Sequence, residues 1–532
     1  MISNDRRPRR VFIVLDADGA RRGFVTDRAP VSATIQGDLR PLGFGPGLTV
    51  EALPVKAASL MGEAAADTGS LTATLALDAF DLWGIRDRVP VQRVTVRAWL
   101  APVDERGVPV DTAGAPMDLL PDYEIFRGVI RSPKWDHTNR TVGFSAVPDL
   151  RLLDIRFPPT VIESERFPAA PTDSASNAVP VVYGTVYAMP VYAVSDVTVP
   201  AIRLLVAGHR VQSSSVVLQR RDSTGGTTTI GAATVLYDID DLGGTYAYVE
   251  ITKINYDAGN ALFAQELTGH VLPDGTAVDG LGDVLLHIWH TYAAERFFDL
   301  DRRRCYAART LLNRYTVGLV FNQQEAGSGL LRILQGRIEG QFPVTFGVSG
   351  GRMGWDCTRI PFQDEIHGLV VGTLTYGLDA HDRQGPDETS ADAVVTSYEM
   401  HTVLAGNVGG TTVTTFANRD NMGVLRGAVT RWGESPIRRM DAPDVTAGDS
   451  AWSVLTDTAV AGSVVRDALT YGGLEGAWYD APLYGVVLVT DEYRRTDGTL
   501  VTLYDDEPML ITAIAPGLDG RVAVSLLRIA GV

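Results

Sequence analysis

Two histidines, His287 and His290, are the only pair close together in the sequence among the eight in the chain. They would lie three residues apart on a helix, and a metal site there needs further ligands, of which Glu295 alone is nearby. Trp289 lies between them on an otherwise apolar segment, so a packing or surface role fits them better. The sequence predicts no metal site and no cofactor.

The string Gly347-Val348-Ser349-Gly350-Gly351 has the letters of the Gly-x-Ser-x-Gly turn that carries a hydrolase nucleophile. That turn runs into a helix, whereas residues 352–355 show no helical pattern, so a β-hairpin turn is the interpretation. Cys305 falls on the apolar face of a predicted helix and is expected to be a buried thiol, while Cys357 has no catalytic context. No Gly-x-x-x-x-Gly-Lys loop for a nucleotide occurs in the chain.

Adjacent acidic residues could serve glycoside hydrolysis if the fold spaced them suitably. The candidates are Asp240-Asp241, Asp491-Glu492 and Asp505-Asp506-Glu507. Neighbours on a strand point to opposite faces, and these runs lie near Gly or Pro, so solvated loops are expected. The basic run Arg302-Arg303-Arg304 follows Asp301 and would pair with acidic neighbours or face another subunit; a phosphate-binding patch is the alternative. No catalytic residue is assigned, and we expect a protein that is not an enzyme.

Charge is distributed unevenly over the 532 residues, whose net charge is −17. Residues 1–155 hold 19 basic and 20 acidic residues, whereas residues 361–532 hold 11 and 24, a net charge of −13. A chain of this sign does not wrap nucleic acid, which requires clustered Lys and Arg. An acidic C-terminal part could instead line a channel that repels DNA.

Several classes of protein are excluded by composition. No apolar stretch is long enough to cross a membrane, and the five apolar residues 11–15 are too short for the core of a signal peptide. We therefore expect a chain made in the cytoplasm that does not insert into a membrane. Two cysteines cannot form a disulfide framework.

Strand signals dominate the chain, and we expect a mainly β protein with a smaller α+β part. Short segments rich in β-branched and aromatic residues, separated by turn residues, predict strands. They are 10–16, 93–100, 125–131, 141–147, 247–254, 484–490 and 521–528. Apolar residues at helical spacing predict four helices. Two of them are capped, one by Asp283 and one by Asp301. A third begins at Ser328, and a fourth fills 450–470 and ends before Gly472.

Composition also suggests domain boundaries. Residues 157–180 contain five prolines and many polar residues, so a joint is expected there, and the polar run 379–392 predicts a surface loop. The expected domains are a first tube-like β domain (1–156), an inserted β-rich domain (157–280), an α/β domain (281–360) and a second tube-like β domain with one helix (361–532). The two tube-like domains would be barrels or sandwiches flanking the inserted ones.

An internal similarity links the two ends of the chain. Residues 129–144 and 511–524 both run from a strand through a proline and an Asp-containing turn to an arginine and a second strand. Pro133, Asp136 and Arg140 correspond to Pro516, Asp519 and Arg521. Each segment is predicted to be a β-hairpin whose first strand ends at the proline. Two related β domains per chain would let a trimer present six similar units.

The order of features resembles the hub proteins at the tail tip or baseplate of long-tailed bacteriophages and of the related gene transfer agents. The residues that carry the resemblance are 126–130, 135–136, 142–144, 181–184, the 283–292 helix, the 350–355 turn, the 450–470 helix and 483–491. The resemblance is diffuse and spans about the whole chain. The resemblance does not extend to a lysozyme, a peptidase or a long fibre, so neither a wall-cutting nor a receptor-binding role is expected of this chain.

The resemblance implies a homotrimeric structural component of the virion, assembled in the host cytoplasm. Its two tube-like domains per chain would form a ring that adapts the six-fold tail tube to three-fold tip parts. Implied partners are the distal tail or tail tube protein, the C-terminus of the tape-measure protein, central fibre or tip proteins, and DNA that passes without specific binding.

Two other classes stay open. A carbohydrate-binding or glycan-hydrolysing β protein would stack sugar rings on exposed tryptophans, with Trp135, Trp432, Trp452 and Trp478 as candidates. A secreted adhesin is disfavoured by the absence of a signal-peptide pattern.

Overall fold

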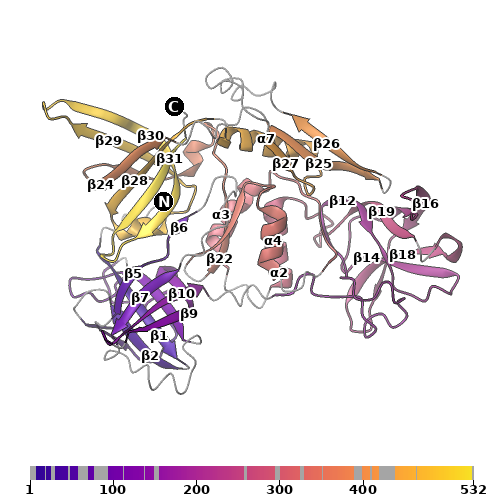
Figure 1. The fold of residues 1–532 in the computed structure, drawn as a ribbon, viewed down its shortest axis with the longest axis horizontal. Helices are drawn as coiled ribbons and strands as arrows, with labels where there is room; N and C mark the ends of the chain where they lie inside the picture. The colour runs from indigo at the N-terminus through magenta and orange to yellow at the C-terminus, as the bar shows by residue number, and fades with distance from the viewer. Residues whose placement is uncertain are drawn as a thin grey trace.

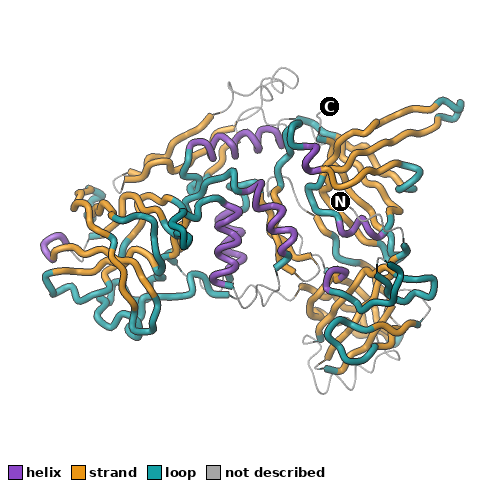
Figure 2. Tube along the Cα trace, turned by 180° about the vertical axis from the view of Figure 1, so that it is seen from behind, coloured by secondary structure: helices purple, strands orange, loops and turns teal. Residues whose placement is uncertain are grey.

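A computed structural model describes residues 7–529 with internal gaps. The gaps are 18, 26–29, 46–47, 58–69, 77–93, 112, 137, 149–154, 257–259, 294–299, 324–328, 350–351, 389–397, 408–409, 418–437 and 463. Strands predominate and helices gather in the middle of the molecule (Figures 1 and 2). The expectation of a mainly β protein with a smaller α part is confirmed. No helix in the described part of the chain is long and apolar enough to span a membrane.

The first β domain is a nine-stranded sheet in the order β3-β4-β2-β1-β8-β9-β10-β7-β5, called here the N-terminal sheet. Its strands are β1 (Arg9–Ala17), β2 (Ala20–Val25), β3 (Val31–Ala33), β4 (Leu42–Gly45), β5 (Leu48–Ala52), β7 (Leu71–Ala76), β8 (Thr95–Pro102), β9 (Glu124–Asp136) and β10 (Thr141–Pro148). A 3-10 turn, η4 (Pro121–Tyr123), precedes β9. Alternate residues of β7 and β10 are buried, the period of a strand with one face on the core.

The last β domain is a sheet in the order β23-β29-β30-β31-β28-β24, called here the C-terminal sheet. Its strands are β23 (Val370–Thr375), β24 (Asp382–Glu388), β28 (Asp467–Leu474), β29 (Val486–Arg494), β30 (Leu500–Pro516) and β31 (Val522–Arg528). A short helix α5 (Ile366–Leu369) precedes β23, and η9 (Gly476–Asp480) follows β28. The two-residue strand β6 (Lys56–Ala57), from the N-terminal part of the chain, joins this sheet beside β30.

The two terminal sheets share one strand order. In chain order, the strands β1, β5, β7, β8, β9 and β10 occupy the same sheet positions as β23, β24, β28, β29, β30 and β31. In the N-terminal sheet, β8, β9 and β10 form an antiparallel meander, and β7 and then β5 continue the sheet beyond β10. In the C-terminal sheet, β29, β30 and β31 form the same meander, and β28 and then β24 continue it beyond β31. One direction differs, because β1 is antiparallel to β8 whereas β23 is parallel to β29.

The two hairpins predicted from the internal similarity both form, as β9–β10 and β30–β31. Pro516 ends β30 as expected. Pro133 does not end its strand; β9 runs three residues further, and the ladder shifts register where Pro133 lies. A proline has no N–H for the ladder, and a β-bulge accommodates it inside a strand. The remaining predicted strands are also present, as β1, β8, β18, β29 and β31.

The inserted β-rich part contains two four-stranded sheets, β12-β19-β15-β16 and β13-β14-β18-β17. Their strands are β12 (Thr185–Pro190), β13 (Tyr192–Ala193), β14 (Ala201–Ala207), β15 (Ser215–Arg221), β16 (Thr227–Thr234), β17 (Leu236–Ile239), β18 (Thr245–Thr252) and β19 (Ala261–Thr268). A 3-10 turn, η6 (Lys253–Asn255), follows β18. The proline-rich stretch 157–180 precedes them and buries Phe157, Ile162 and Phe167.

Between these β regions lies a central unit with its own core. It consists of α2 (Leu281–Tyr292), α3 (Arg302–Leu312), α4 (Leu330–Ile338), the pair β11 (Val181–Tyr183) and β20 (Leu319–Phe321), and the hairpin β21 (Val344–Ser349) with β22 (Arg352–Cys357). Packed on it are α7 (Gly448–Gly462) and a three-stranded sheet of β25 (Tyr398–Asn407), β26 (Gly410–Ala417) and β27 (Arg438–Asp441).

Three local predictions need correction. Asp283 lies in the first turn of α2, whose N-cap is Gly280, whereas Asp301 caps α3 as expected through its bond from the Arg304 N–H. The helix expected over 450–470 ends at Gly462, and its last part is instead strand β28. The surface loop expected over 379–392 contains edge strand β24, where Pro386 lies at a register shift. An edge strand tolerates a proline at such an irregularity.

Candidate functional site

The strongest structural feature is the contact between the two terminal sheets. After β5 the chain leaves the N-terminal sheet and forms β6, which pairs antiparallel with β30. Ala57 lies opposite Ala513 and Lys56 lies opposite Ile514. One hydrophobic cluster includes buried residues of both sheets, among them Leu75 of β7 and Ile514 of β30. The two β domains therefore form one packed body (Figure 1).

Polar contacts fix the relative position of the sheets. Arg9, at the start of β1, donates from Nη2 to Asp480 Oδ2 at 2.7 Å, and the arginine side chain is only 2% exposed. The backbone of Arg9 lies against the β30–β31 turn, where a Cβ added to Gly520 would be 1.8 Å from the Arg9 carbonyl oxygen. Gly520 also has a φ of +79°, which side-chain-bearing residues rarely adopt. The turn and β1 fit together only with glycine there.

Lys56 joins the same contact from β6. Its Nζ donates to the Tyr479 carbonyl oxygen at 2.7 Å and lies 4.1 Å from the centre of the Tyr479 ring. Burial lowers the pKa of Lys56 to about 8, and Asp480 nearby acts in the opposite direction. Two basic groups from the N-terminal part of the chain, Arg9 and Lys56, thus lie close to Asp480 of the C-terminal β domain.

A second cluster joins the inserted β part to the central unit. The imidazoles of His209 and His270 stack with ring centres 3.5 Å apart, and His270 and His287 follow at 4.5 Å. The Tyr183 hydroxyl lies 2.9 Å from His287 Nδ1, and the Tyr292 hydroxyl lies 3.0 Å from His270 Nε2. Helix α2 supplies His287 and Tyr292, so this stack connects it to the inserted domain.

The histidine stack is held in the neutral state. His209 accepts at Nε2 from the Val182 N–H at 2.9 Å and donates from Nδ1 to the Arg210 carbonyl at 2.8 Å. Burial lowers the pKa of His209 to about 4 and that of His270 to about 2. Burial also lowers the pKa of His287. Stacked imidazoles remain favourable only while they are uncharged.

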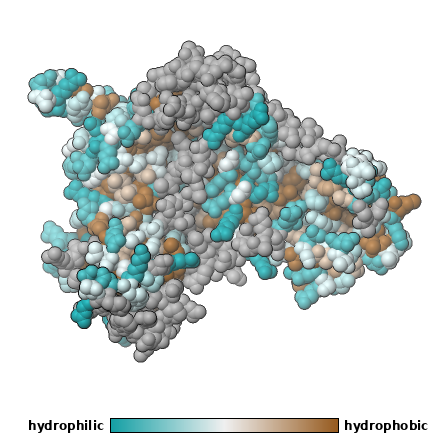
Figure 3. All heavy atoms as spheres, in the orientation of Figure 1, coloured by the Kyte–Doolittle hydropathy of each residue, from teal (hydrophilic) through white to brown (hydrophobic). Residues whose placement is uncertain are grey.

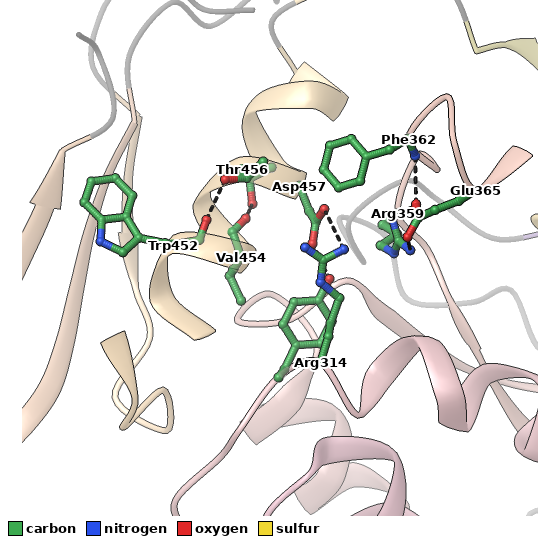
Figure 4. Close-up of polar contacts among 10 residues, drawn as sticks. Arg314, Arg359, Phe362, Glu365, Trp452, Val454, Thr456 and Asp457 are labelled. Carbon is green, nitrogen blue, oxygen red and sulfur yellow. Dashed lines mark hydrogen bonds and ion pairs between the residues drawn. The ribbon is translucent and has the colours of Figure 1, made fainter. Parts of the chain in front are cut away.

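A third cluster fixes α7 to the central unit (Figure 4). Asp457 on α7 is fully buried, accepts a hydrogen bond from the Tyr315 hydroxyl, and lies 3.8 Å from Arg314 Nη1. Burial raises the pKa of this carboxyl. Nearby, Arg359 binds both oxygens of Glu365 at 2.7 and 2.6 Å. A buried, paired network of this kind fixes one packing arrangement of the elements that supply it.

The histidine pair and the nucleophile candidates named from the sequence lie in the histidine stack, on the surface, in a hairpin and in the core. His287 belongs to the stack described above and His290 is exposed, while Glu295 lies outside the described residues. Ser349 ends β21, which pairs antiparallel with β22, so the segment is a hairpin as predicted. Cys305 and Cys357 are buried, and burial raises the pKa of both thiols, to about 12 for Cys357.

The acidic runs do not all lie in solvated loops, because two of them are on strands. Asp491 on β29 is fully buried, where it accepts from Arg383 at 2.9 Å and from the Tyr471 hydroxyl at 2.8 Å. Asp505, Asp506 and Glu507 lie on β30. Asp240-Asp241 follows β17 in a turn, as expected, although Asp240 also pairs with Arg166 at 2.8 Å.

The other candidates are distributed over the fold. Arg304 pairs with buried Asp356, whereas Arg302 and Arg303 are exposed. Of the tryptophans proposed for sugar stacking, Trp478 is buried and Trp135 is partly buried, and Trp432 lies outside the described residues. Trp452 is 38% exposed and points away from the Asp457 cluster (Figure 4).

Comparison with known proteins gives no assignment. The sequence matches no family model and no curated protein. In the described residues, no group of three or more His, Cys, Asp or Glu side chains is arranged to hold a metal ion.

Proposed function

We propose that this chain is a structural ring component, a homotrimeric hub at the tip of a bacteriophage or gene-transfer-agent tail. The observation that carries the proposal is the shared strand order of the two terminal sheets, including the equivalent hairpins β9–β10 and β30–β31. A chain that contains the same module twice supplies six similar modules when it trimerises. Such a ring can match a six-fold tube on one face and three-fold parts on the other.

The contact between the sheets supports a mechanical role. The two modules share one hydrophobic cluster and are joined by β6, so they would act as a rigid pair rather than as independently moving domains. The central unit and the inserted β domain both extend to one side of this pair (Figure 1). Ring closure would also cover sheet edges that otherwise promote aggregation.

In this role the hub binds its own copies, the tail tube or distal tail protein, the end of the tape-measure protein and central tip proteins. DNA passes through the ring without specific binding, and the chain catalyses no reaction. The acidic C-terminal part, with a net charge of −13 over residues 361–532, would repel phosphate wherever it faces the channel.

Light scattering and negative-stain imaging of the purified full chain test the proposal together. The expected result is a mass of three copies and a three-fold ring with a central hole. A particle that stays monomeric at high protein concentration contradicts the proposal, because obligate assemblies bury several thousand Å2, an order of magnitude typical of permanent interfaces.

The alternative is a carbohydrate-binding or glycan-hydrolysing protein, for which the observation in favour is exposed Trp452. Sugar sites commonly need an aromatic platform together with polar groups that converge on the ligand. Binding of purified protein to a panel of bacterial glycans distinguishes this alternative. Saturable binding that Trp452→Ala abolishes would favour it over the ring.

A further inference from the structure

The contact within one chain uses opposite ends of the two equivalent sheets. On the N-terminal sheet it involves the end where β1 begins and β5 finishes, through Arg9 and β6. On the C-terminal sheet it involves the end where β30 finishes and β31 begins, at the turn that contains Gly520. The modules therefore meet head to tail, which is a heterologous contact.

Each sheet has a second end that this contact does not use. On the N-terminal sheet it is the end with the β9–β10 turn, where Asp136 of β9 pairs with Thr141 of β10. On the C-terminal sheet it is the end where β24 finishes and β28 begins, at the pair Glu388 and Asp467. The β9–β10 turn of the N-terminal sheet corresponds to the β30–β31 turn of the C-terminal sheet. The end that one sheet leaves unused is therefore equivalent to the end that the other sheet uses in the contact.

The exposed charged side chains at the two unused ends are mostly of opposite sign. Near the β9–β10 turn, Arg131, Lys134 and Arg140 are exposed. At the unused end of the C-terminal sheet, Asp387 of β24, Glu492 of β29, and Asp505 and Asp506 of β30 are exposed, and they outnumber the exposed Arg494 and Arg495 beside them. Tyr504, the residue before Asp505 on β30, donates from its hydroxyl to Asp467 at the start of β28 at 3.0 Å.

The contact within the chain has the same charge pattern. There, Arg9 of the N-terminal sheet and Lys56 of β6 lie close to Asp480 of η9 in the C-terminal β domain. An arrangement in which basic ends of one module meet acidic ends of the other favours alternation of the two modules around a ring. It also disfavours contact between two C-terminal sheets, because like charges facing each other are repelled.

We propose that the basic end of the N-terminal sheet, formed by Arg131, Lys134 and Arg140, docks on the acidic end of the C-terminal sheet of a second copy, formed by Asp387, Asp505 and Asp506. This contact repeats between copies the head-to-tail contact that β6 and Gly520 make within one copy. It rests on the proposed ring function and specifies the surface through which the ring closes.

Charge reversal in the full-length protein tests the interface. Arg131→Glu with Lys134→Glu, and separately Asp387→Lys with Asp506→Lys, should each weaken trimer formation about 100-fold, because reversed charges face like charges across the contact. Combining all four substitutions should restore the trimer. A matched control, Arg106→Glu with Arg221→Glu, reverses two exposed arginines elsewhere and should leave the trimer intact.

The readout is the mass by sedimentation over a range of protein concentrations, with circular dichroism melting as the folding check. A wild-type chain that forms no trimer overturns the ring itself. A wild-type trimer that survives both reversals overturns this interface and leaves the ring standing. Loss of the trimer in both reversals without recovery in the combined variant also overturns the direct pairing of these two ends.

Discussion

Replacing Gly520 by alanine should break the contact between the terminal sheets. The new Cβ would lie 1.8 Å from the Arg9 carbonyl oxygen, where real contacts essentially never fall below 3.0 Å, and the atom it meets is backbone that cannot rotate away. The positive φ of Gly520 adds about 1–2 kcal/mol for any L-residue. Overpacking adds about 1–3 kcal/mol more, so the expected total loss is about 2–5 kcal/mol.

Gly498 supplies the matched control, because it lies in the turn at the other end of β30. Its φ is +86°, similar to the +79° of Gly520, but a Cβ there would meet nothing within 4 Å. Gly498→Ala should therefore cost only the conformational part, about 1–2 kcal/mol. The projecting β29–β30 ribbon on which it lies stands clear of the body, with a hydrophilic tip (Figure 3).

The assay compares urea unfolding of the two variants and hydrogen exchange in β6. Gly520→Ala should lower the unfolding midpoint further and should speed exchange in the Lys56–Ala57 segment, whereas Gly498→Ala should leave that exchange unchanged. Equal destabilisation by both substitutions, with β6 still protected, would refute the packing argument.

Three further predictions concern other parts of the molecule. The folded-state pKa values of the histidine stack lie below the ordinary 6.5, so stability should fall as pH drops from about 6.5 toward 4; His270→Phe should flatten that dependence in pH-resolved melting curves. Arg337→Met should cost about 3–5 kcal/mol in urea unfolding because it removes the cationic partner of the buried Asp444 carboxylate and leaves it only the hydrogen bond from Gln341, whereas Arg439→Met at an exposed pair should cost under about 1 kcal/mol. Trp452→Ala should leave the trimer mass unchanged in light scattering.

Local patterns in the sequence identified seven of the strands, β1, β8, β9, β10, β18, β29 and β31, and both terminal hairpins. Alternation of apolar and polar residues is a short-range signal, and β10 shows it over its whole length. The continuation of β9 beyond Pro133 was not predicted, because a β-bulge depends on how the partner strand is aligned. Apolar residues at helical spacing continue from α7 into β28, and only tertiary packing decides where the helix ends and the strand begins.

The histidine stack could not be found from the sequence. His209 and His270 lie far apart in the chain, and each reads by itself as an isolated residue on a strand or turn. Their meeting depends on how the inserted sheets pack against α2. Burial of Asp491 was missed for a related reason, because its partner Arg383 comes from β24, a segment whose Gly and Pro content predicted a loop.

The correspondence of the two terminal sheets was visible only as a similarity between two hairpins. The full strand order depends on pairings between segments hundreds of residues apart, and the insertion that contains α7 separates β24 from β28. A shared strand order leaves little sequence similarity, because a strand needs only a suitable apolar pattern to keep its place in a sheet.

An electron cryomicroscopy reconstruction of the full-length protein is the most direct test of this account. It should show three copies whose six terminal modules alternate around one ring, with the contact between copies superimposing on the contact between β6 and β30 inside each copy. A reconstruction in which the N-terminal and C-terminal sheets lie in different layers, or in which copies meet only through the central units, would contradict it.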